Sequence, residues 1–272
     1  MTVLIGHASI SEKGTVNGAK GDSTKKEVCT RSFYDKPWDF VAIHPDPKVR
    51  EKHAEAVEDA CANNNIGYGQ DDRNTLNDKA KKVNYDLSKV GKCNCDCSSL
   101  QNVAAMASGA PGVKYGSNGW VTSNMEKNLK AAGYKIIKDS AYLKSAAYCV
   151  RGAIYVKSGS HTVCGLTNGS KAAQTLKKAG IPSSNTGTTV SSAVKAEGAQ
   201  EFDKTLAGTY KTTTGLNMRT GAGTDKKIML TVPEGASVRN YGYYTEDGTG
   251  KKWLYVTYKG VTGFCSSKCL KK

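Results

Sequence analysis

A cysteine-rich run at 93–99 ends where an apolar helical pattern begins. The pattern covers 96–107, and its apolar side chains recur at helical spacing, at Leu100, Val103, Ala104 and Ala107. Cys97 would stand at the start of this helix, where unpaired backbone N–H groups and the positive end of the helix dipole favour thiolate over thiol. Both effects lower the pKa of a thiol from about 8.5, so we expect a cysteine nucleophile at Cys97.

A cysteine nucleophile also needs a base that carries its proton. His161 lies 64 residues after Cys97 on a predicted strand, 161–166, and follows the small residues Gly159 and Ser160. A strand histidine beside a cysteine at a helix start is the arrangement of papain-like cysteine hydrolases. The sequence therefore predicts attack on a carbonyl carbon by a Cys–His pair.

The remaining histidines and cysteines allow other interpretations. His7, His44 and His53 lie in loop-like or exposed contexts, and we interpret them as solvated surface groups. The cysteine run could bind zinc, with a fourth ligand from Cys61, Cys149 or a histidine. Structural zinc favours a CxxC spacing and a matching second pair, and the sequence has neither. We therefore expect no metal and no other cofactor.

The elements that must position the Cys–His pair follow an α+β order. The charge-laced segment 49–62 is typical of an exposed helix, and 123–132 is a further predicted helix. Two strands at 152–157 and 161–166 follow, closed by an Asn-Gly turn at 168–169. Helices that precede adjacent strands predict helices packed on an antiparallel sheet.

Changes in composition divide the chain into two modules. Residues 183–199 are rich in Ser, Thr, Gly and Ala, which is typical of a flexible tether. From about 206 short β-like runs alternate with turn signals, which predicts a small all-β barrel. The expected domains are 1–169, a linker over 170–205, and 206–272.

Charge and composition limit the partners. Of the 272 residues 38% are hydrophobic, and 39 Lys and Arg outnumber 24 Asp and Glu, giving a net charge of +15. This surplus favours a polyanionic partner such as nucleic acid, an anionic membrane or an acidic cell wall. The sequence lacks a nucleic-acid recognition motif, so we do not expect a nucleic-acid partner. No stretch approaches the about 18 apolar residues of a membrane span, so no membrane insertion is expected.

The N-terminus and the cysteines indicate a compartment. Residues 1–6 lack the apolar region and the cationic start of a secretory signal. Nine cysteines are an odd number, which we interpret as mostly reduced thiols. The expected location is the cytoplasm, with another factor needed for release.

Several motifs together resemble the NlpC/P60 group of peptidoglycan hydrolases, and its phage-encoded branch most of all. They are the run 95–99 with the helix after it, 151–154, and 159–163, and the upstream stretches 21–28 and 66–73 resemble the N-terminal part of phage and clostridial lysins. The likeness covers nearly all of 7–169. It implies a papain-like α+β domain with N-terminal helices packed on an antiparallel sheet.

The resemblance also implies roles for single residues. The cysteine that follows Asp is the family's nucleophile and the first histidine of the next sheet is its base, which correspond to Cys97 and His161. Tyr68 matches a tyrosine that lines the family's active site, although it could equally be a core tyrosine. We expect Asp96 and Ser98, which flank the nucleophile, to contact the substrate with it.

The sequence departs from the family pattern after the histidine strand. The family's third polar residue, which orients the histidine, normally lies on the next strand, but here a turn and a helical or linker-like segment follow. Asn168 is the candidate for this role. The family often has Asp where Ala153 stands, which changes the hydrogen bonding expected near that strand.

The C-terminal module resembles a bacterial SH3 (SH3b) cell-wall binding domain. The matching runs include Leu-Asn-Met-Arg at 216–219 and Trp-Leu-Tyr-Val at 253–256. Residues 206–272 hold eleven Lys and Arg against four Asp and Glu, a net charge of +7 that would concentrate the protein on an anionic wall. Tyr243 and Trp253 belong to an aromatic group that could form a ligand face, of which half or more would be core.

These likenesses imply a phage-type endolysin that hydrolyses an amide bond of the peptidoglycan stem peptide as an endopeptidase. It would remain in the host bacterial cytoplasm until it is released to the wall. An N-acetylmuramoyl-L-alanine amidase would use the same residues, since both cleave amides by acyl transfer. A non-catalytic wall-binding phage protein is a third possibility. The oligomeric state is left open by the sequence.

Overall fold

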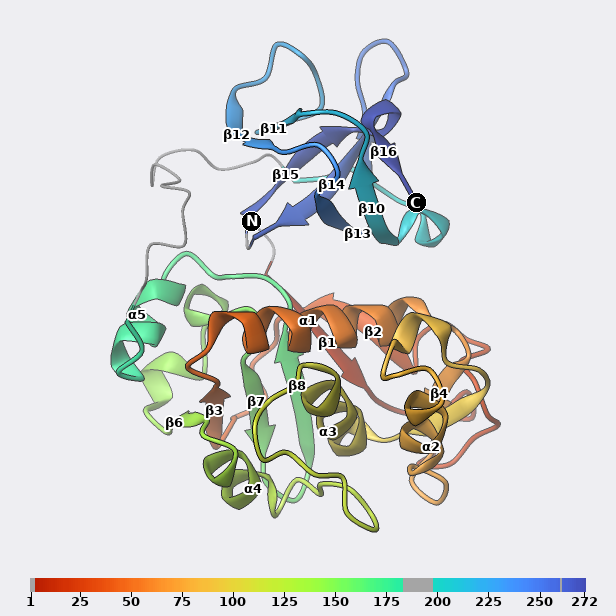
Figure 1. The fold of residues 1–272 in the computed structure, drawn as a ribbon, viewed down its shortest axis with the longest axis vertical. Helices are drawn as coiled ribbons and strands as arrows, with labels where there is room; N and C mark the ends of the chain where they lie inside the picture. Colours follow the sequence, from red (N-terminus) through yellow and green to blue (C-terminus); the bar gives the residue numbers. More distant parts are fainter. Residues whose placement is uncertain (1–2, 183–197, 260) are drawn as a thin grey trace. The chain divides into compact units, whose positions relative to one another are not determined.

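The computed structural model describes residues 3–182, 198–259 and 261–272. The chain divides into two compact units, an N-terminal unit that holds the described residues 3–182 and a C-terminal unit that holds the described residues from 198 onwards (Figure 1). The N-terminal unit is α+β and the C-terminal unit is all-β in its described part, which confirms the predicted fold class. Most of the predicted tether, 183–197, lies outside the described residues.

A six-stranded antiparallel sheet forms the centre of the N-terminal unit. Its order is β2-β1-β8-β7-β3-β6, so the first strand of the chain lies beside the last strand of the unit. The strands are β1 (Leu4–Ala8), β2 (Val28–Ser32), β3 (Phe40–Ile43), β6 (Lys135–Ile137), β7 (Ile154–Lys157) and β8 (His161–Gly165). A separate parallel pair joins β4 (Ile66–Tyr68) to β5 (Cys93–Cys95).

Helices cover both faces of this sheet. The α-helices are α1 (Pro47–Ala62), α2 (Thr75–Lys81), α3 (Cys97–Ala107), α4 (Met125–Ala131) and α5 (Ala172–Lys178), and the short 3-10 helices are η1 (Leu87–Lys89), η2 (Ser140–Tyr142) and η3 (Ala146–Tyr148). The predicted helices at 96–107 and 123–132 are confirmed as α3 and α4.

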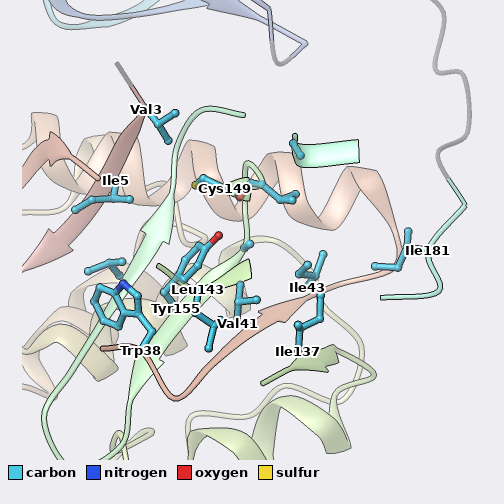
Figure 2. Close-up of a cluster of buried hydrophobic side chains, with 14 residues drawn as sticks. Val3, Ile5, Trp38, Val41, Ile43, Ile137, Leu143, Cys149, Tyr155 and Ile181 are labelled. Atoms are coloured by element: carbon cyan, nitrogen blue, oxygen red, sulfur yellow. Dashed lines mark hydrogen bonds between the residues drawn. The ribbon is translucent and has the colours of Figure 1, made fainter. Parts of the chain in front are cut away.

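The alternation of side chains along the strands explains the two layers. On one face Phe40, Ala42, Ile154 and Val156 pack with residues of α1, α3 and α4 (Figure 1). On the other face Ile5, Trp38, Val41, Ile43, Tyr155 and Val163 pack with loop residues and α5 (Figure 2). Ala153 is fully buried in this second cluster, so a methyl group fills the place where the resembled family often has Asp.

The helix α1 is buried on one side, which corrects the exposed helix predicted for 49–62. Eight of its sixteen residues are buried, Glu58 among them. Arg151 donates to the carboxylate of Glu58 and to the carbonyl of Leu166, and so neutralises the buried acid. The charges that made the helix look exposed therefore include a buried ion pair.

The segment after β8 belongs to the N-terminal unit, which corrects the predicted linker start at 170. Ala172 and Ile181 are buried in the apolar cluster behind the sheet, and Leu176 of α5 packs against it. The hydroxyl of Thr175 donates to the Tyr148 carbonyl at 2.7 Å. The apolar side chains of α5 therefore fix the chain up to residue 182.

The C-terminal unit is a single antiparallel sheet of eight strands. Its order is β12-β11-β15-β14-β13-β10-β16, with β9 paired to β13, and the described pairings do not close it into a barrel. The elements are β9 (Glu201–Phe202), η4 (Lys204–Leu206), β10 (Gly208–Thr212), β11 (Leu216–Arg219), β12 (Ile228–Val232), β13 (Ser237–Glu246), β14 (Lys252–Tyr258), β15 (Val261–Ser266), η5 (Ser267–Cys269) and β16 (Leu270–Lys271). Because β9 pairs with β13 of this sheet and η4 packs against β13, the unit begins before the predicted residue 206.

Both faces of this curved sheet bury apolar side chains. The larger core holds Met218, Val232, Val238 and Val256, and the smaller one holds Trp253, Tyr255 and Phe264. Among the described residues of the whole chain, no helix combines the length and the apolar character needed to cross a membrane.

Candidate functional site

The start of α3 is held by a buried polar network. Asp96 is the N-cap: its Oδ1 accepts the Ser99 N–H at 2.7 Å, and the Ser99 hydroxyl accepts the Asp96 N–H at 2.9 Å. This reciprocal pair is a capping box. Arg73 reaches Asp96 Oδ2 from α2's side at 2.8 Å and donates to the Ser98 hydroxyl at 3.0 Å. Asp96 and Ser98, predicted as substrate contacts, are thus engaged in fixing the helix start.

Cys97 is the first residue of α3 and its sulfur faces backbone amides. The backbone N–H groups of Thr162 and Ser98 both act to lower the pKa of the Cys97 thiol, and Thr162 is the neighbour of His161 on β8. The side chain is buried, with 6% of the residue exposed. The structure thus brings the Cys97 sulfur to the same end of β8 as His161.

Burial decides the protonation state of Cys97. Desolvation, followed by the Asp96 carboxylate, raises the pKa of the Cys97 thiol to about 12, although the two N–H donors and Arg73 act to lower it. The predicted thiolate at the helix start is therefore wrong for the free protein. In a dry site the desolvation penalty on a buried thiolate exceeds the stabilisation from N–H dipoles.

His161 is the first residue of β8 and is also neutral. Burial, and then the charge of Lys36, lowers the pKa of His161 to about 4. Its ring lies over Trp38 with centroids 6.4 Å apart. No hydrogen bond joins Cys97 to His161 among the described residues, and catalytic hydrogen bonds often tighten only when substrate binds.

His7 is the polar partner of the His161 ring. Its Nδ1 lies 3.1 Å from Nε2 of His161, and the residue is only 1% exposed. The strands β1 and β8 pair at Gly6 and Cys164, and this register extended by one residue places His7 diagonally from His161 on the same face of the sheet. Burial, and then the charge of His161, lowers the pKa of His7 to about 3.

The interpretation of His7, His44 and His53 as solvated surface groups is wrong. All three are buried, with 1%, 6% and 0% exposed. His53 contacts Gln101 at 2.9 Å and His44 accepts the Asp46 N–H at 3.1 Å. The apolar alternation of the first strand, in which Val3, Ile5 and His7 share a face, is the signal that could have placed His7 in the interior.

Asn168 lies away from the His161 ring. His161 begins β8, whereas Asn168 follows its far end, where its Oδ1 accepts the Arg151 N–H at 2.8 Å. In the described part of the chain the contact on the ring comes from His7 instead. The geometry therefore corrects the prediction that Asn168 orients the histidine, because the strand that supplies this group comes from the start of the chain.

Tyr68 lies on the strand paired with the one that leads into Cys97. The parallel pairing of β4 with β5 places Tyr68 opposite Cys95, two residues before Cys97. Gln70 donates its amide N–H to the Tyr68 hydroxyl at 3.1 Å, which leaves the phenolic hydrogen able to donate elsewhere. The buried carboxylate of Glu27 accepts the Tyr68 backbone N–H at 2.8 Å and holds the strand in place.

The described residues offer no metal centre. No group of three or more His, Cys, Asp and Glu side chains is arranged to hold a metal ion in 3–182 or in the described part of the C-terminal unit.

The predicted ligand residues of the C-terminal unit differ in exposure. Trp253 is buried in the smaller core, and its indole N–H donates to Asp247 at 2.9 Å. Tyr243 is half-buried and its ring lies 5.1 Å from that of Phe202, which is 59% exposed. An aromatic surface is thus present, and it is built from Tyr243 and Phe202 rather than Trp253.

Comparisons with known families match both units. A family model described as an endolysin-like domain matches residues 5–172, and a model of the bacterial SH3 domain matches residues 214–271. No curated protein and no solved structure matches the chain. The first match begins within β1 and ends past β8, so it includes His7, Cys97 and His161.

Proposed function

The chain belongs to the family of endolysin-like domains and is a phage-type cell-wall hydrolase with a C-terminal SH3 domain that binds the wall, and from this premise we propose that Cys97 and His161 cleave its substrate. The bond is an amide of the peptidoglycan stem peptide, and the chemistry is that of an NlpC/P60-type cysteine peptidase. One observation carries the proposal: Cys97 begins α3, which packs against β8, and His161 begins β8 with its Nε2 3.1 Å from His7 Nδ1.

The reaction starts from a neutral pair. Because the pKa of Cys97 is raised and that of His161 is lowered, thiol and imidazole are both uncharged at neutral pH. When the sulfur attacks the carbonyl carbon, the thiol proton passes to Nδ1 of His161 as the S–C bond forms. Charge then develops only in the transition state, where the site can stabilise it.

Two donors face the oxygen that becomes negative. The Cys97 N–H lies at the start of α3, where the helix dipole favours negative charge. The Tyr68 hydroxyl accepts the hydrogen bond that Gln70 donates and keeps its own hydrogen, so it supplies the second donor. Both act on the tetrahedral oxyanion rather than on the thiol, and so they assist the reaction despite the high pKa of Cys97.

The remaining steps complete the hydrolysis and restore the starting protonation states of Cys97 and His161. The C–N bond breaks as His161 gives its proton to the leaving amine, which leaves a thioester on Cys97. Water then attacks the thioester while His161 takes a proton from it. The C–S bond breaks, the acid product leaves, and the proton returns to the sulfur.

The C-terminal unit would hold the enzyme on the wall. Its eleven Lys and Arg against four Asp and Glu over 206–272 attract an anionic surface, and the rings of Tyr243 and Phe202 offer an exposed contact. We propose storage in the host cytoplasm until lysis, where the thiols stay reduced.

The test compares wild type with Cys97→Ala on purified cell walls. We expect wild type to reduce the turbidity of the walls and Cys97→Ala to leave it unchanged. Cys269→Ser is the matched control, because it removes a thiol of the C-terminal unit and should lyse like wild type. Lysis by Cys97→Ala would overturn the proposal.

Mass spectrometry of the fragments identifies the bond. New amino groups on amino acids inside the stem peptide would indicate an endopeptidase, as proposed. Glycan strands freed of their L-alanine would indicate an amidase instead. Binding without lysis by wild type would indicate a targeting protein.

A further inference from the structure

A cysteine on the neighbouring strand continues the line of polar side chains behind His161. The strands β2, β1 and β8 are adjacent, and Cys29 of β2 pairs directly with His7 of β1. The Cys29 sulfur lies 3.7 Å from His7 Nε2, and His7 Nδ1 lies 3.1 Å from His161 Nε2. Three adjacent strands thus contribute one residue each to a row, joined by two contacts, that ends at His161.

The far end of this row has a fixed direction. The Cys29 thiol donates to the Lys26 carbonyl oxygen, with sulfur and oxygen 3.2 Å apart. The carbonyl oxygen accepts the S–H hydrogen at the shorter of the two distances, 3.2 Å against 3.7 Å to His7 Nε2, which leaves the sulfur lone pairs for His7. His7 must then carry its hydrogen on Nε2 to make the contact with Cys29.

This choice determines the hydrogen on the next ring. A neutral imidazole has one N–H and one lone pair, so a His7 protonated on Nε2 offers a lone pair on Nδ1. His161 must therefore donate an Nε2–H to this lone pair of His7, which leaves the lone pair of His161 on its own Nδ1. That is the nitrogen that takes the proton of Cys97 in the proposed function.

We propose that Cys29 is a positioning residue that selects the reactive tautomer of His161 through His7. The inference rests on the proposed function for its consequence, because the tautomer matters only if His161 is the base. Without the sulfur, His7 can carry its hydrogen on Nδ1 and donate it to His161 Nε2. The hydrogen of His161 then sits on Nδ1, and the ring cannot accept the proton of Cys97.

The surroundings keep His7 suited to this task. His7 is 1% exposed, so water does not compete for its nitrogens. Burial, and then the charges of His161, Arg31 and Lys36, lowers the pKa of His7 to about 3, so the ring stays neutral and keeps one lone pair. A charged His7 would donate from both nitrogens and force the inactive tautomer on His161.

The direct test is the tautomer of each ring in the full-length protein. Long-range ¹H–¹⁵N spectra distinguish Nδ1–H from Nε2–H in a neutral histidine. We expect Nε2–H for both His7 and His161 in wild type and in Cys29→Ser, whose hydroxyl can also donate to Lys26 and accept from His7. We expect Cys29→Ala to populate Nδ1–H. An Nδ1–H on His7 in wild type, or an unchanged tautomer in Cys29→Ala, would overturn the inference.

Kinetics provide a second readout. Cys29→Ala should lower the rate of wall lysis about 3- to 10-fold, the rate equivalent of one neutral hydrogen bond, with its unfolding midpoint close to that of wild type. Cys29→Ser should recover most of the rate. Equal rates for Cys29→Ala and wild type, or equal losses for Cys29→Ala and Cys29→Ser, would contradict the role of Cys29.

The two proposals fail in different ways. If Cys97→Ala keeps lysing walls, the proposed function fails, and the spectra still report whether Cys29 sets the tautomers. If Cys97→Ala is inactive and the spectra do not respond to Cys29→Ala, the inference about Cys29 fails by itself.

Discussion

At the Cys97 sulfur two opposing effects act on the thiol proton. Amide N–H groups and Arg73 favour the thiolate, whereas burial and the Asp96 carboxylate favour the thiol and raise its pKa to about 12. The local sequence revealed the first effect because a helix start can be recognised from spacing. The second depends on how deeply the tertiary packing covers the side chain. Under the proposed mechanism Cys97 therefore keeps its proton until a bound substrate promotes its transfer to His161.

The contact between His7 and His161 gives a prediction at this scale. His7→Phe keeps a ring of similar shape between β2 and β8 but removes the Nδ1 acceptor. We expect lysis of cell walls to fall at least about tenfold, since the base loses the group that fixes its tautomer. The measurement is the initial rate of turbidity loss at equal protein concentration.

A second buried histidine supplies the control. His44→Phe also replaces a buried imidazole that lies 4.9 Å from a tyrosine ring, Tyr134, and His44 is outside the row formed by Cys29, His7 and His161. It should alter stability with little effect on the rate per folded molecule. Equal rates for His7→Phe and His44→Phe would show that the His7 contact has no catalytic role.

At the scale of the elements, patterns within a segment were predictable and pairings between distant segments were not. The helix α3 and the strands β7 and β8 follow from spacing inside runs of about ten residues. The placement of β1 beside β8 joins residues more than 150 positions apart, at Gly6 and Cys164, and nothing local encodes it. The helix start at Cys97 and the strand that begins at His161 could therefore be predicted, while the side chain that contacts the His161 ring was sought on the wrong strand.

The junction between β7 and α1 gives a prediction for the packing of elements. Gly152 has φ of +76°, and a Cβ there would lie 2.1 Å from the Arg50 carbonyl oxygen. Gly152→Ala should therefore lower the free energy of unfolding by about 3 kcal/mol, through both the positive φ and the clash with backbone. Urea unfolding of the full-length protein measures it.

Gly133 separates these two causes. It has φ of +83° with nothing within 4 Å of a Cβ, so Gly133→Ala introduces only the conformational strain. Gly133→Ala should therefore lower the free energy of unfolding by about 1 kcal/mol. Losses of equal size at the two glycines would contradict the close approach of β7 to α1.

At the scale of the whole molecule, both parts of the chain carry positive charge. The eleven Lys and Arg against four Asp and Glu over 206–272 leave 28 against 20 for residues 1–205, so the two parts contribute +7 and +8 of the net charge of +15. An anionic wall therefore attracts the part that holds Cys97 as well as the SH3 part. Each part is therefore attracted to the anionic wall by its own positive charge.

The buried histidines give a prediction for the stability of the N-terminal unit. Burial lowers the pKa of His53 to about 4, that of His161 to about 4 and that of His7 to about 3, from 6.5 in the unfolded chain. Between pH 6.5 and 4 these histidines bind protons in the unfolded chain but stay neutral in the folded unit. The free energy of unfolding is therefore highest above pH 6.5 and falls as the pH drops through this window.

The size of this loss follows from the most buried ring. His53 is 0% exposed, and its shift corresponds to about 3 kcal/mol lost by pH 4. Glu27 and Glu55, whose pKa values burial raises, oppose the loss in the lower part of the window. Urea unfolding at steps from pH 7.5 to 4.5 measures the net effect, and His53→Leu should flatten the curve by the share of one ring. A free energy of unfolding that stays constant from pH 6.5 to 4.5 would mean that these rings are accessible to protons in the folded protein, against the burial that keeps both His161 and its partner His7 neutral.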